Sequence, residues 1–393
     1  MRDKIKTLVL VRNGVGVRRV FYYTVLRGIL RVKCDPLIVE KIKKFDLLAK
    51  VLGSGYDALS YMLDWQDAFV NAPELDVEVC NMNNLIEYNK ARKFIKDYPL
   101  VIILHSAAGD DMSLLLKTAH WFQGRKGKLV IFIGNEYDLM PEKVDFIRSV
   151  GADYICSQLP IDVAEWLYGG CESAKILPMP HALNPEVYYP SIPVKERKID
   201  IGFIGAIYPY FIGDIERRKF LEFIKKNAGK FNLRCDIRFL NVPRKQWALF
   251  LNSCRGIVGA EAGTYFLDRR GILLSNAKEY IKKYPRASFE EIYKRFFERP
   301  DVEYTSGKAI SSRHFEAIGT KTCQILLEGY YNGILKPDIH YISVKKDLSN
   351  IRDALERFMD ESFRERLVKD TYEYVLAEHT YRRRVETLFR FIS

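Results

Sequence analysis

Short apolar runs alternate with longer amphipathic segments along most of the chain, and this alternation limits the fold more than any other feature. Strands that alternate with helices form βαβ units, which build parallel sheets. A first series predicts strands near 7–11, 77–80, 100–104, 128–133, 153–157 and 175–177. A second series predicts strands near 199–204, 234–239, 256–259, 322–326 and 340–344. The sequence therefore predicts an α/β protein with two doubly wound units in tandem.

The segment between the two series indicates where the domains meet. Residues 178–198 are rich in proline and show no helical period, which is typical of a connection. We expect a first domain at 1–185, a linker at 186–198, a second domain at 199–346 with an insertion at 265–308, and a helical tail at 347–393. The tail has apolar positions at helical spacing, so it can pack on either domain or cross between them.

Composition narrows the class of protein. Hydrophobic residues at 48% and charged residues at 28% fit a globular chain and exclude disordered and collagen-like classes. The apolar runs are far shorter than the ~20 residues that span a bilayer, so no transmembrane helix is predicted, and the start of the chain lacks the pattern of a signal peptide. The 7 cysteines are scattered without metal-ligand spacing. This pattern favours a reducing, cytoplasmic location and no zinc site.

The net charge of +12 favours anionic partners. Nucleotide phosphates, nucleic acid and an anionic membrane surface all fit this sign. Basic residues are interspersed with acidic ones, as on solvated helix faces, which favours a nucleotide or a peripheral membrane contact over a nucleic-acid groove.

Loops that follow the strands are where doubly wound sheets bind ligands. After the first strand come Asn13, Gly14 and Gly16, which fit either a ligand loop or a simple turn. His105 follows the strand at 100–104, where it could transfer a proton or be a structural histidine. Asn135 and Glu136 follow the next strand and form a polar cluster at the same rim, or serve only the turn. The predicted acceptor side consists of Asn13, Gly14, Gly16, Asn135 and Glu136, and His105 is a candidate catalytic residue.

The second series has its own loop candidates. Gly205 ends the strand at 199–204, and Arg217 and Arg218 follow it. A glycine lets the backbone approach a phosphate, and a guanidinium can pair with it in bidentate fashion. Taken alone, these arginines also fit a solvated helix face.

A helix start near residue 311 carries the clearest local signal. Serines supply the N-cap, and the helix dipole together with Arg313 favours an anion. Glu316 lies about one turn into this helix, where a carboxylate suits the hydroxyls of a diol such as ribose. The alternative is a capping box in which Glu316 only serves the helix start.

These motifs resemble a known family. The order IGFIG, GAEAGT and RHFEAIGTKTCQILLEG, preceded by ILPMPHALNPEVYYP, resembles GT-B glycosyltransferases, most closely the spore-maturation-type (CgeB-like) members related to glycosyltransferase family 4. The resemblance covers roughly residues 98–393. It implies two facing Rossmann-like domains with a cleft between them, and a nucleotide-sugar donor in the second domain.

The resemblance also implies roles for individual residues. The ribose-binding carboxylate falls on Glu316, and a histidine that faces the transferred sugar falls on His105. The remaining residues implied for the donor site are Gly205, Arg217, Arg218, Ser312, Arg313, His314 and Phe315. The family's earlier glutamate would fall on Lys308, so we expect Glu261 to take its place, with 265–308 as a lid, an acceptor element or an inert insertion.

The predicted function is transfer of a sugar from a UDP- or GDP-sugar to a glycan, lipid-linked or protein acceptor, as in polysaccharide biosynthesis. No DxD motif follows a strand, and amides with guanidinium groups can stabilise a departing diphosphate, so we expect no metal and no other cofactor. The resemblance implies retention at the anomeric carbon. The alternatives are a DNA-base glycosyltransferase, a nucleotide-sugar epimerase and a non-catalytic binding protein with the same fold.

Overall fold

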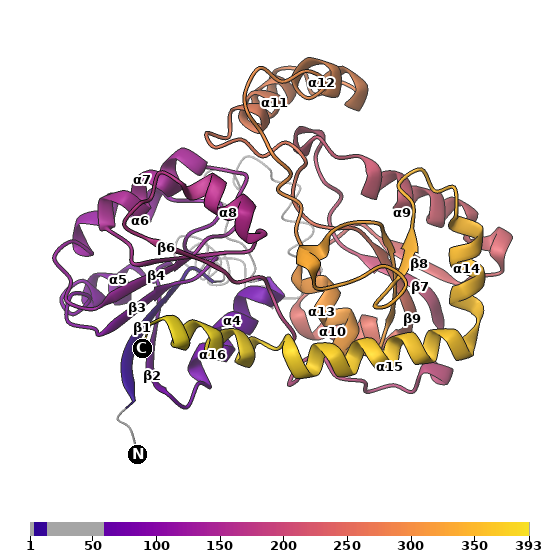
Figure 1. Cartoon of the computed structure of the whole chain (residues 1–393), viewed down its shortest axis with the longest axis horizontal. Coiled ribbons are helices and arrows are strands. Elements are labelled where there is room, and N and C mark those ends of the chain that lie inside the picture. Colours follow the sequence, from indigo (N-terminus) through magenta and orange to yellow (C-terminus); the bar gives the residue numbers. More distant parts are fainter. Residues whose placement is uncertain (1–3, 14–58, 393) are drawn as a thin grey trace, which may run out of the picture.

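The computed structural model describes residues 4–13 and 59–392, and two parallel sheets lie side by side in it (Figure 1). The first sheet has the strand order β2-β1-β3-β4-β5-β6. Its strands are β1 (Ile5–Val11), β2 (Leu75–Asn81), β3 (Leu100–Ile103), β4 (Lys128–Phe132), β5 (Tyr154–Ser157) and β6 (Lys175–Pro178). Each strand is parallel to its neighbours.

Helices cover both faces of the first sheet. The helices that precede residue 170 are α4 (Ser60–Val70), α5 (Leu85–Ala91), α6 (Ser113–Thr118), α7 (Met140–Val150) and α8 (Ile161–Tyr168). Side chains of α5, α6, α7 and α8 pack on one face, and those of α4 pack on the other. Because both faces are buried, the strands appear in the sequence as continuous apolar runs.

The second sheet has the order β11-β10-β9-β7-β8. Its strands are β7 (Ile199–Ile204), β8 (Cys235–Arg238), β9 (Cys254–Gly259), β10 (Cys323–Leu327) and β11 (Ile342–Val344). The helices around it are α9 (Glu216–Asn227), α10 (Arg244–Ser253), α13 (Ser312–Gly319), α14 (Ile351–Met359) and α15 (Glu361–Glu378). The chain leaves β7 toward β8 on one side and returns to β9 on the other. The switch point therefore lies between β7 and β9.

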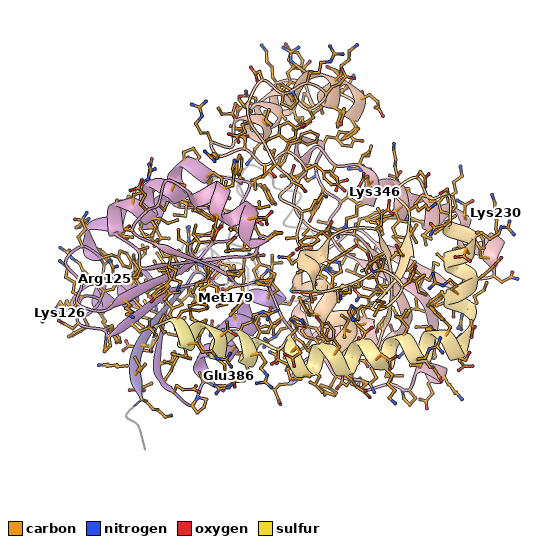
Figure 2. The ribbon with its side chains drawn as sticks, viewed as in Figure 1. Arg125, Lys126, Met179, Lys230, Lys346 and Glu386 are labelled. Carbon is orange, nitrogen blue, oxygen red and sulfur yellow. The ribbon has the colours of Figure 1, made fainter. Side chains whose placement is uncertain are left out.

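The last helix, α16 (Tyr381–Ile392), crosses from the second sheet to the first (Figure 1). Its apolar side chains share a core with α4 and with strands of the first sheet. The crossing is fixed where Leu183 donates its N–H to the carbonyl of His379 at 2.8 Å and accepts from the N–H of Tyr381 at 3.0 Å. Met179, at the start of the connecting segment, is buried near the centre of the molecule (Figure 2).

The insertion forms a helical hairpin, α11 (Ile272–Lys283) and α12 (Phe289–Phe296), which lies above the junction of the two domains in Figure 1. It has a small apolar core of its own with the short helix at Tyr210–Ile212. It reaches the first domain through an ion pair of Lys278 with Asp138 at 2.9 Å. The insertion therefore contacts both domains.

The strands predicted from the sequence are all present, and the α/β prediction with two Rossmann-like sheets is confirmed.

Basic residues are spread over the surface, with Arg125 and Lys126 at one end of the molecule and Lys230 at the other (Figure 2). No helix in the described ranges has both the length and the apolar character of a membrane span.

Candidate active site

A small cavity lies at the switch point of the second sheet. Its volume is about 30 Å³, and it lies at the ends of β7 and β9 beside the starts of α9 and α13. The lining residues are Phe203, Arg217, Trp247, Ile257, Val258, Gly259, Ala260, Ser311, Arg313, His314 and Leu326. This volume suits about one water molecule. A nucleotide would need the surrounding side chains to move.

Two arginines meet at this cavity. The Arg313 guanidinium carbon lies 4.0 Å from the ring centre of Trp247, and that of Arg217 lies 4.8 Å from the ring centre of Tyr208. Neither arginine pairs with a carboxylate within the described part of the chain, and Nε of Arg217 is buried without a hydrogen-bond partner there. Burial lowers the pKa of Arg313 to about 10, so it remains a cation at neutral pH. Two adjacent cations without a partner form a site for an anion.

Gly205 lies beside Arg313 at the end of β7, where a side chain would crowd the Phe203 ring. A Cβ atom at this position would lie 3.6 Å from the guanidinium carbon of Arg313 and 3.1 Å from the Phe203 ring. Arg313 also donates a hydrogen bond to the carbonyl of Ile204. Arg218, by contrast, donates to the carbonyl of Tyr208 at 3.3 Å and does not line the cavity.

The first turn of α13 is capped by a histidine. The Ser311 N–H donates to Nδ1 of His314 at 3.0 Å, so His314 has the capping role that the sequence left open for Glu316. Burial lowers the pKa of His314 to about 4, which leaves its ring neutral. Ser312 is buried in the same turn.

Phe315 requires a correction. The sequence placed it in the donor site, but its side chain is fully buried in the core beneath α13 and does not line the cavity. The helix turns this position toward the second sheet because the preceding residues of the first turn face the cavity.

Glu316 connects the two domains. Its Oε1 accepts a hydrogen bond from the Ser60 hydroxyl at 2.6 Å, and its Oε2 accepts one from Trp247 Nε1 at 2.6 Å. Ser60 is the first residue of α4, in the first domain. Glu316 therefore accepts a hydroxyl group one helical turn away from Arg313.

A second buried carboxylate lies nearby. Asp64 Oδ1 accepts from Asn184 and from Arg244, both at 2.8 Å, and Arg244 also pairs with Asp67 at 2.7 Å. Asp64 Oδ2 has no hydrogen-bond partner within the described ranges. Burial, together with the charge of Glu316, raises the pKa of Asp64 to about 7.

Sequence reasoning missed Ser60, Asp64, Arg244 and Trp247. A signal was present only for Asp64, which lies between the apolar residues of SYMLDWQDAF on the face that α4 buries. Ser60, Arg244 and Trp247 contact residues that are far away in the sequence, so no local pattern marks them.

Glu261 lies at the end of β9 and is held by the loop that follows β10. Its Oε1 accepts from the Tyr331 N–H at 2.6 Å, and burial raises its pKa. Lys308, the position where the resemblance would put the earlier glutamate, forms a buried ion pair with Asp214. Glu261 and Lys308 thus have different partners on the same side of the second domain.

The candidates of the first domain have varied surroundings. His105 is buried against Trp65, Phe132 and His181, with ring centres 5.3 to 5.7 Å away. Neither ring nitrogen has a hydrogen-bond partner among the described residues. Burial, together with the charge of His181, lowers the pKa of His105 well below its usual value. His105 is therefore a neutral ring beneath α4.

The polar rim of the first domain is mostly engaged in internal contacts. Asn13 donates from Nδ2 to Gln66 at 2.8 Å, and Asn135, with φ of 45°, donates to Asp110. Gly14 and Gly16 lie outside the described residues.

Glu136 also requires a correction. It accepts hydrogen bonds from Ser157, Tyr168 and the N–H of Gln158 at 2.6 to 2.8 Å, inside the first domain. Because these donors hold both carboxylate oxygens within the core, Glu136 does not face an acceptor. It fastens the ends of β4 and β5 to α8.

Comparison with protein families identifies the second half of the chain. A family model described as glycosyl transferase-like matches residues 217–390, which include Arg217, Glu261, Arg313 and Glu316. Residues 217–390 are a glycosyl transferase-like domain. A search of curated proteins gives no match.

Solved structures give the fold of the whole chain. The chain is similar to T4 phage BGT in complex with UDP-glucose, with 8% identity, 98% of each chain covered and a TM-score of 0.50. It is also similar to Anabaena HepE in complex with UDP-glucose (10% identity, 98% of this chain and 100% of that chain, TM-score 0.47). A third similar structure is the trehalose-6-phosphate synthase OtsA (12% identity, 98% of each chain, TM-score 0.43). The predicted GT-B fold is confirmed.

Proposed function

We propose that the chain transfers a sugar from a UDP- or GDP-sugar to a glycan, lipid-linked or protein acceptor. The observation that carries this proposal is the pair Arg217 and Arg313, which meet at one cavity without a carboxylate partner in the described ranges. Both lie in or at the edge of the segment that matches the glycosyl transferase-like family. A diphosphate supplies the negative charge that this pair lacks.

The contact of Ser60 with Glu316 supports a ribose site. Glu316 accepts a hydroxyl hydrogen bond from Ser60 at 2.6 Å, and a ribose hydroxyl is the same kind of donor. In the proposed complex the ribose replaces Ser60 at Oε1. Because Ser60 occupies Oε1 of Glu316, the proposed complex requires the contact between α4 and α13 to open at this point.

The proposed reaction breaks the bond between the anomeric carbon of the sugar and the diphosphate oxygen. The acceptor oxygen forms the new bond and passes its proton to the departing diphosphate oxygen, which also keeps the electron pair of the broken bond. Arg217 and Arg313 stabilise the negative charge of the departing diphosphate, which is why we propose a metal-independent reaction. We assign the sugar-facing positions to His105 and Glu261 and propose retention at the anomeric carbon. The proposed setting is the cytoplasm.

One observation favours a second candidate function. Lys308 stands where the family has its earlier glutamate and is ion-paired with Asp214. A protein that binds the nucleotide without transferring the sugar would fit this change. Donor hydrolysis and transfer distinguish the two candidates, because only an enzyme releases the free nucleoside diphosphate.

The experiment compares two neighbouring arginines. UDP, GDP, ADP and CMP are titrated calorimetrically, with EDTA present, into the wild type, Arg217→Gln and Arg218→Gln. Loss of one charge-assisted contact should weaken nucleoside diphosphate binding about tenfold in Arg217→Gln. Arg218→Gln is the matched control and should bind like the wild type, because Arg218 does not line the cavity. Equal affinities for all three proteins would reject the site.

A further inference from the structure

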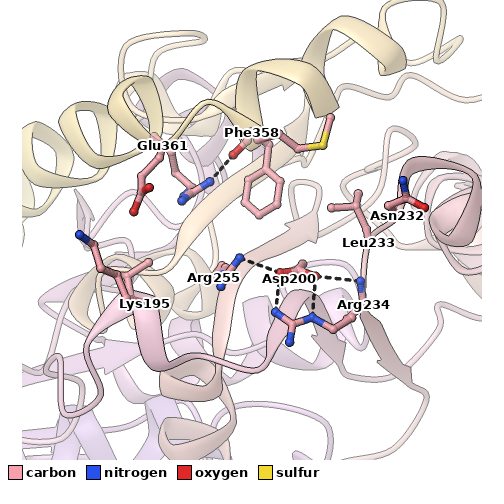
Figure 3. A pocket seen from close by; sticks show the side chains of 11 residues that line it. Lys195, Asp200, Asn232, Leu233, Arg234, Arg255, Phe358 and Glu361 are labelled. Carbon is pink, nitrogen blue, oxygen red and sulfur yellow. Dashed lines mark hydrogen bonds and ion pairs between the residues drawn. The ribbon is translucent and has the colours of Figure 1, made fainter.

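A larger hollow lies at the opposite edge of the second sheet, where β7, β8 and β9 begin (Figure 3). Its volume is about 620 Å³. The lining residues are Val194, Lys195, Asp200, Asn232, Leu233, Arg234, Arg255, Phe358, Met359, Glu361 and Arg364. The volume lies within the range of small-molecule sites. Because the proposed donor site is at the other end of the same strands, this hollow is a separate place on the molecule.

Positive charge dominates the wall of the hollow. The four cationic side chains are Lys195, Arg234, Arg255 and Arg364, and the two carboxylates are Asp200 and Glu361. Asp200 is already paired with Arg234 at 3.0 Å and with Arg255 at 3.2 Å (Figure 3). The remaining charge therefore favours an anion.

The burial of Arg364 also favours an anion in the hollow. The residue is 7% exposed and donates from Nη1 to the carbonyl of Phe358 at 2.5 Å. Its Nε is buried without a hydrogen-bond partner, and it forms no ion pair with a described residue. A buried cation is costly unless a counter-charge and hydrogen bonds satisfy it. An anion in the hollow would supply both.

The rest of the wall consists of Asn232 and several apolar side chains. Leu233, Phe358 and Met359 line the hollow together with the cations. Such a combination recognises a ligand with an anionic end and an apolar body. Inorganic phosphate alone would leave the apolar wall in water.

We propose that this hollow binds an organic phosphate. The phosphate group meets Arg364, Arg255 and Lys195, and the apolar part of the ligand packs on Phe358 and Met359. A soluble phosphate ester and the headgroup of an anionic lipid share this chemistry. The site is separate from the proposed transfer reaction, and it places a second ligand beside the segment that connects the domains.

The test uses 1-naphthyl phosphate, with inorganic phosphate for comparison. Calorimetric titration of the full chain should show one site, and Lys195→Glu should weaken it about tenfold because a cation becomes an anion. Lys198→Glu is the matched control from the same segment, since Lys198 does not line the hollow, and should bind like the wild type. Arg255→Gln is a second test that keeps Asp200 paired with Arg234.

Two further arms separate the outcomes. Arg217→Gln should bind 1-naphthyl phosphate normally, so failure of the donor site leaves this proposal intact. Sedimentation with phosphatidylcholine vesicles, with and without phosphatidic acid, tests the lipid source. Vesicle binding that needs Lys195, without binding of 1-naphthyl phosphate, assigns the site to a lipid headgroup. The proposal is overturned if Lys195→Glu and Arg255→Gln bind 1-naphthyl phosphate and the phosphatidic acid vesicles like the wild type. It is also overturned if the wild type binds neither 1-naphthyl phosphate nor these vesicles.

Discussion

The Ser60 hydroxyl donates to Oε1 of Glu316 at 2.6 Å and thereby links α4 of the first domain to α13 of the second. The partner of the proposed ribose carboxylate is thus a hydroxyl of the protein itself. In the proposed complex, a ribose hydroxyl replaces the Ser60 hydroxyl at this oxygen. The affinity for a nucleotide therefore depends on how strongly the two domains hold each other.

Ser60→Ala should bind UDP more tightly. The substitution leaves Glu316 Oε1 without its donor in the free protein, which costs about 1 kcal/mol, and a ribose hydroxyl then restores the bond. We expect about fivefold tighter binding by calorimetry. Glu316→Gln should bind about tenfold more weakly. Weaker binding by Ser60→Ala would show that Ser60 is a donor contact.

Trp247→Phe should destabilise the fold. The phenyl ring still packs beneath Arg313, but the bond from Nε1 to Glu316 is lost, which should cost about 2 kcal/mol of unfolding free energy. Trp166→Phe is the matched control, because Trp166 donates to Glu303 at the surface and should cost about 0.5 kcal/mol. Urea unfolding followed by circular dichroism measures both. Equal losses would contradict the role of Trp247.

The fold was predictable because its strands are buried on both faces. LVIIL and KLVIFI are continuous apolar runs, and such runs separated by amphipathic segments fix both the class and the order of elements. The apolar positions of the tail predict helices in the same way. They do not identify the sheet on which α16 packs, because any apolar face offers the same driving force.

Candidate residues could be predicted where a strand end or a helix start marks them in the local sequence. Arg313 and Glu316 lie on one helix start, and the dipole and spacing indicate their chemistry. Ser60 and Trp247 contact Glu316 from segments far away in the chain, so no local pattern contains them. Phe315 was misplaced because the sequence does not show which side of α13 faces the core.

Asp64 should make stability depend on pH. Its pKa rises from 3.8 to about 7 in the folded protein, so between these values the unfolded chain loses a proton that the folded chain keeps. The contribution of Asp64 to stability therefore falls as pH rises through this window and is constant above it. Asp64→Asn cannot titrate, so its unfolding free energy relative to that of the wild type should rise by about 3 kcal/mol between about pH 4.5 and 7.5. Urea unfolding curves that shift in parallel would contradict this assignment.

His105→Phe should separate stability from activity. Neither nitrogen of the buried ring has a partner among the described residues, so an apolar ring removes a burial cost of about 1 kcal/mol. The melting temperature should stay the same or rise. If His105 faces the transferred sugar, release of UDP from UDP-glucose should fall about 100-fold. A joint loss of stability and turnover would instead mark His105 as a structural residue.

The position of α16 has a consequence for synthesis on the ribosome. Val385 and Leu388 complete the apolar core beneath β1 and β3, whose residues are translated more than two hundred and fifty positions earlier. The part of this face that α4 does not cover must therefore wait for its partner until the second domain has been translated. The domain that is made first is thus the last to finish folding, and a chaperone that shields an exposed apolar sheet would act on it during that interval.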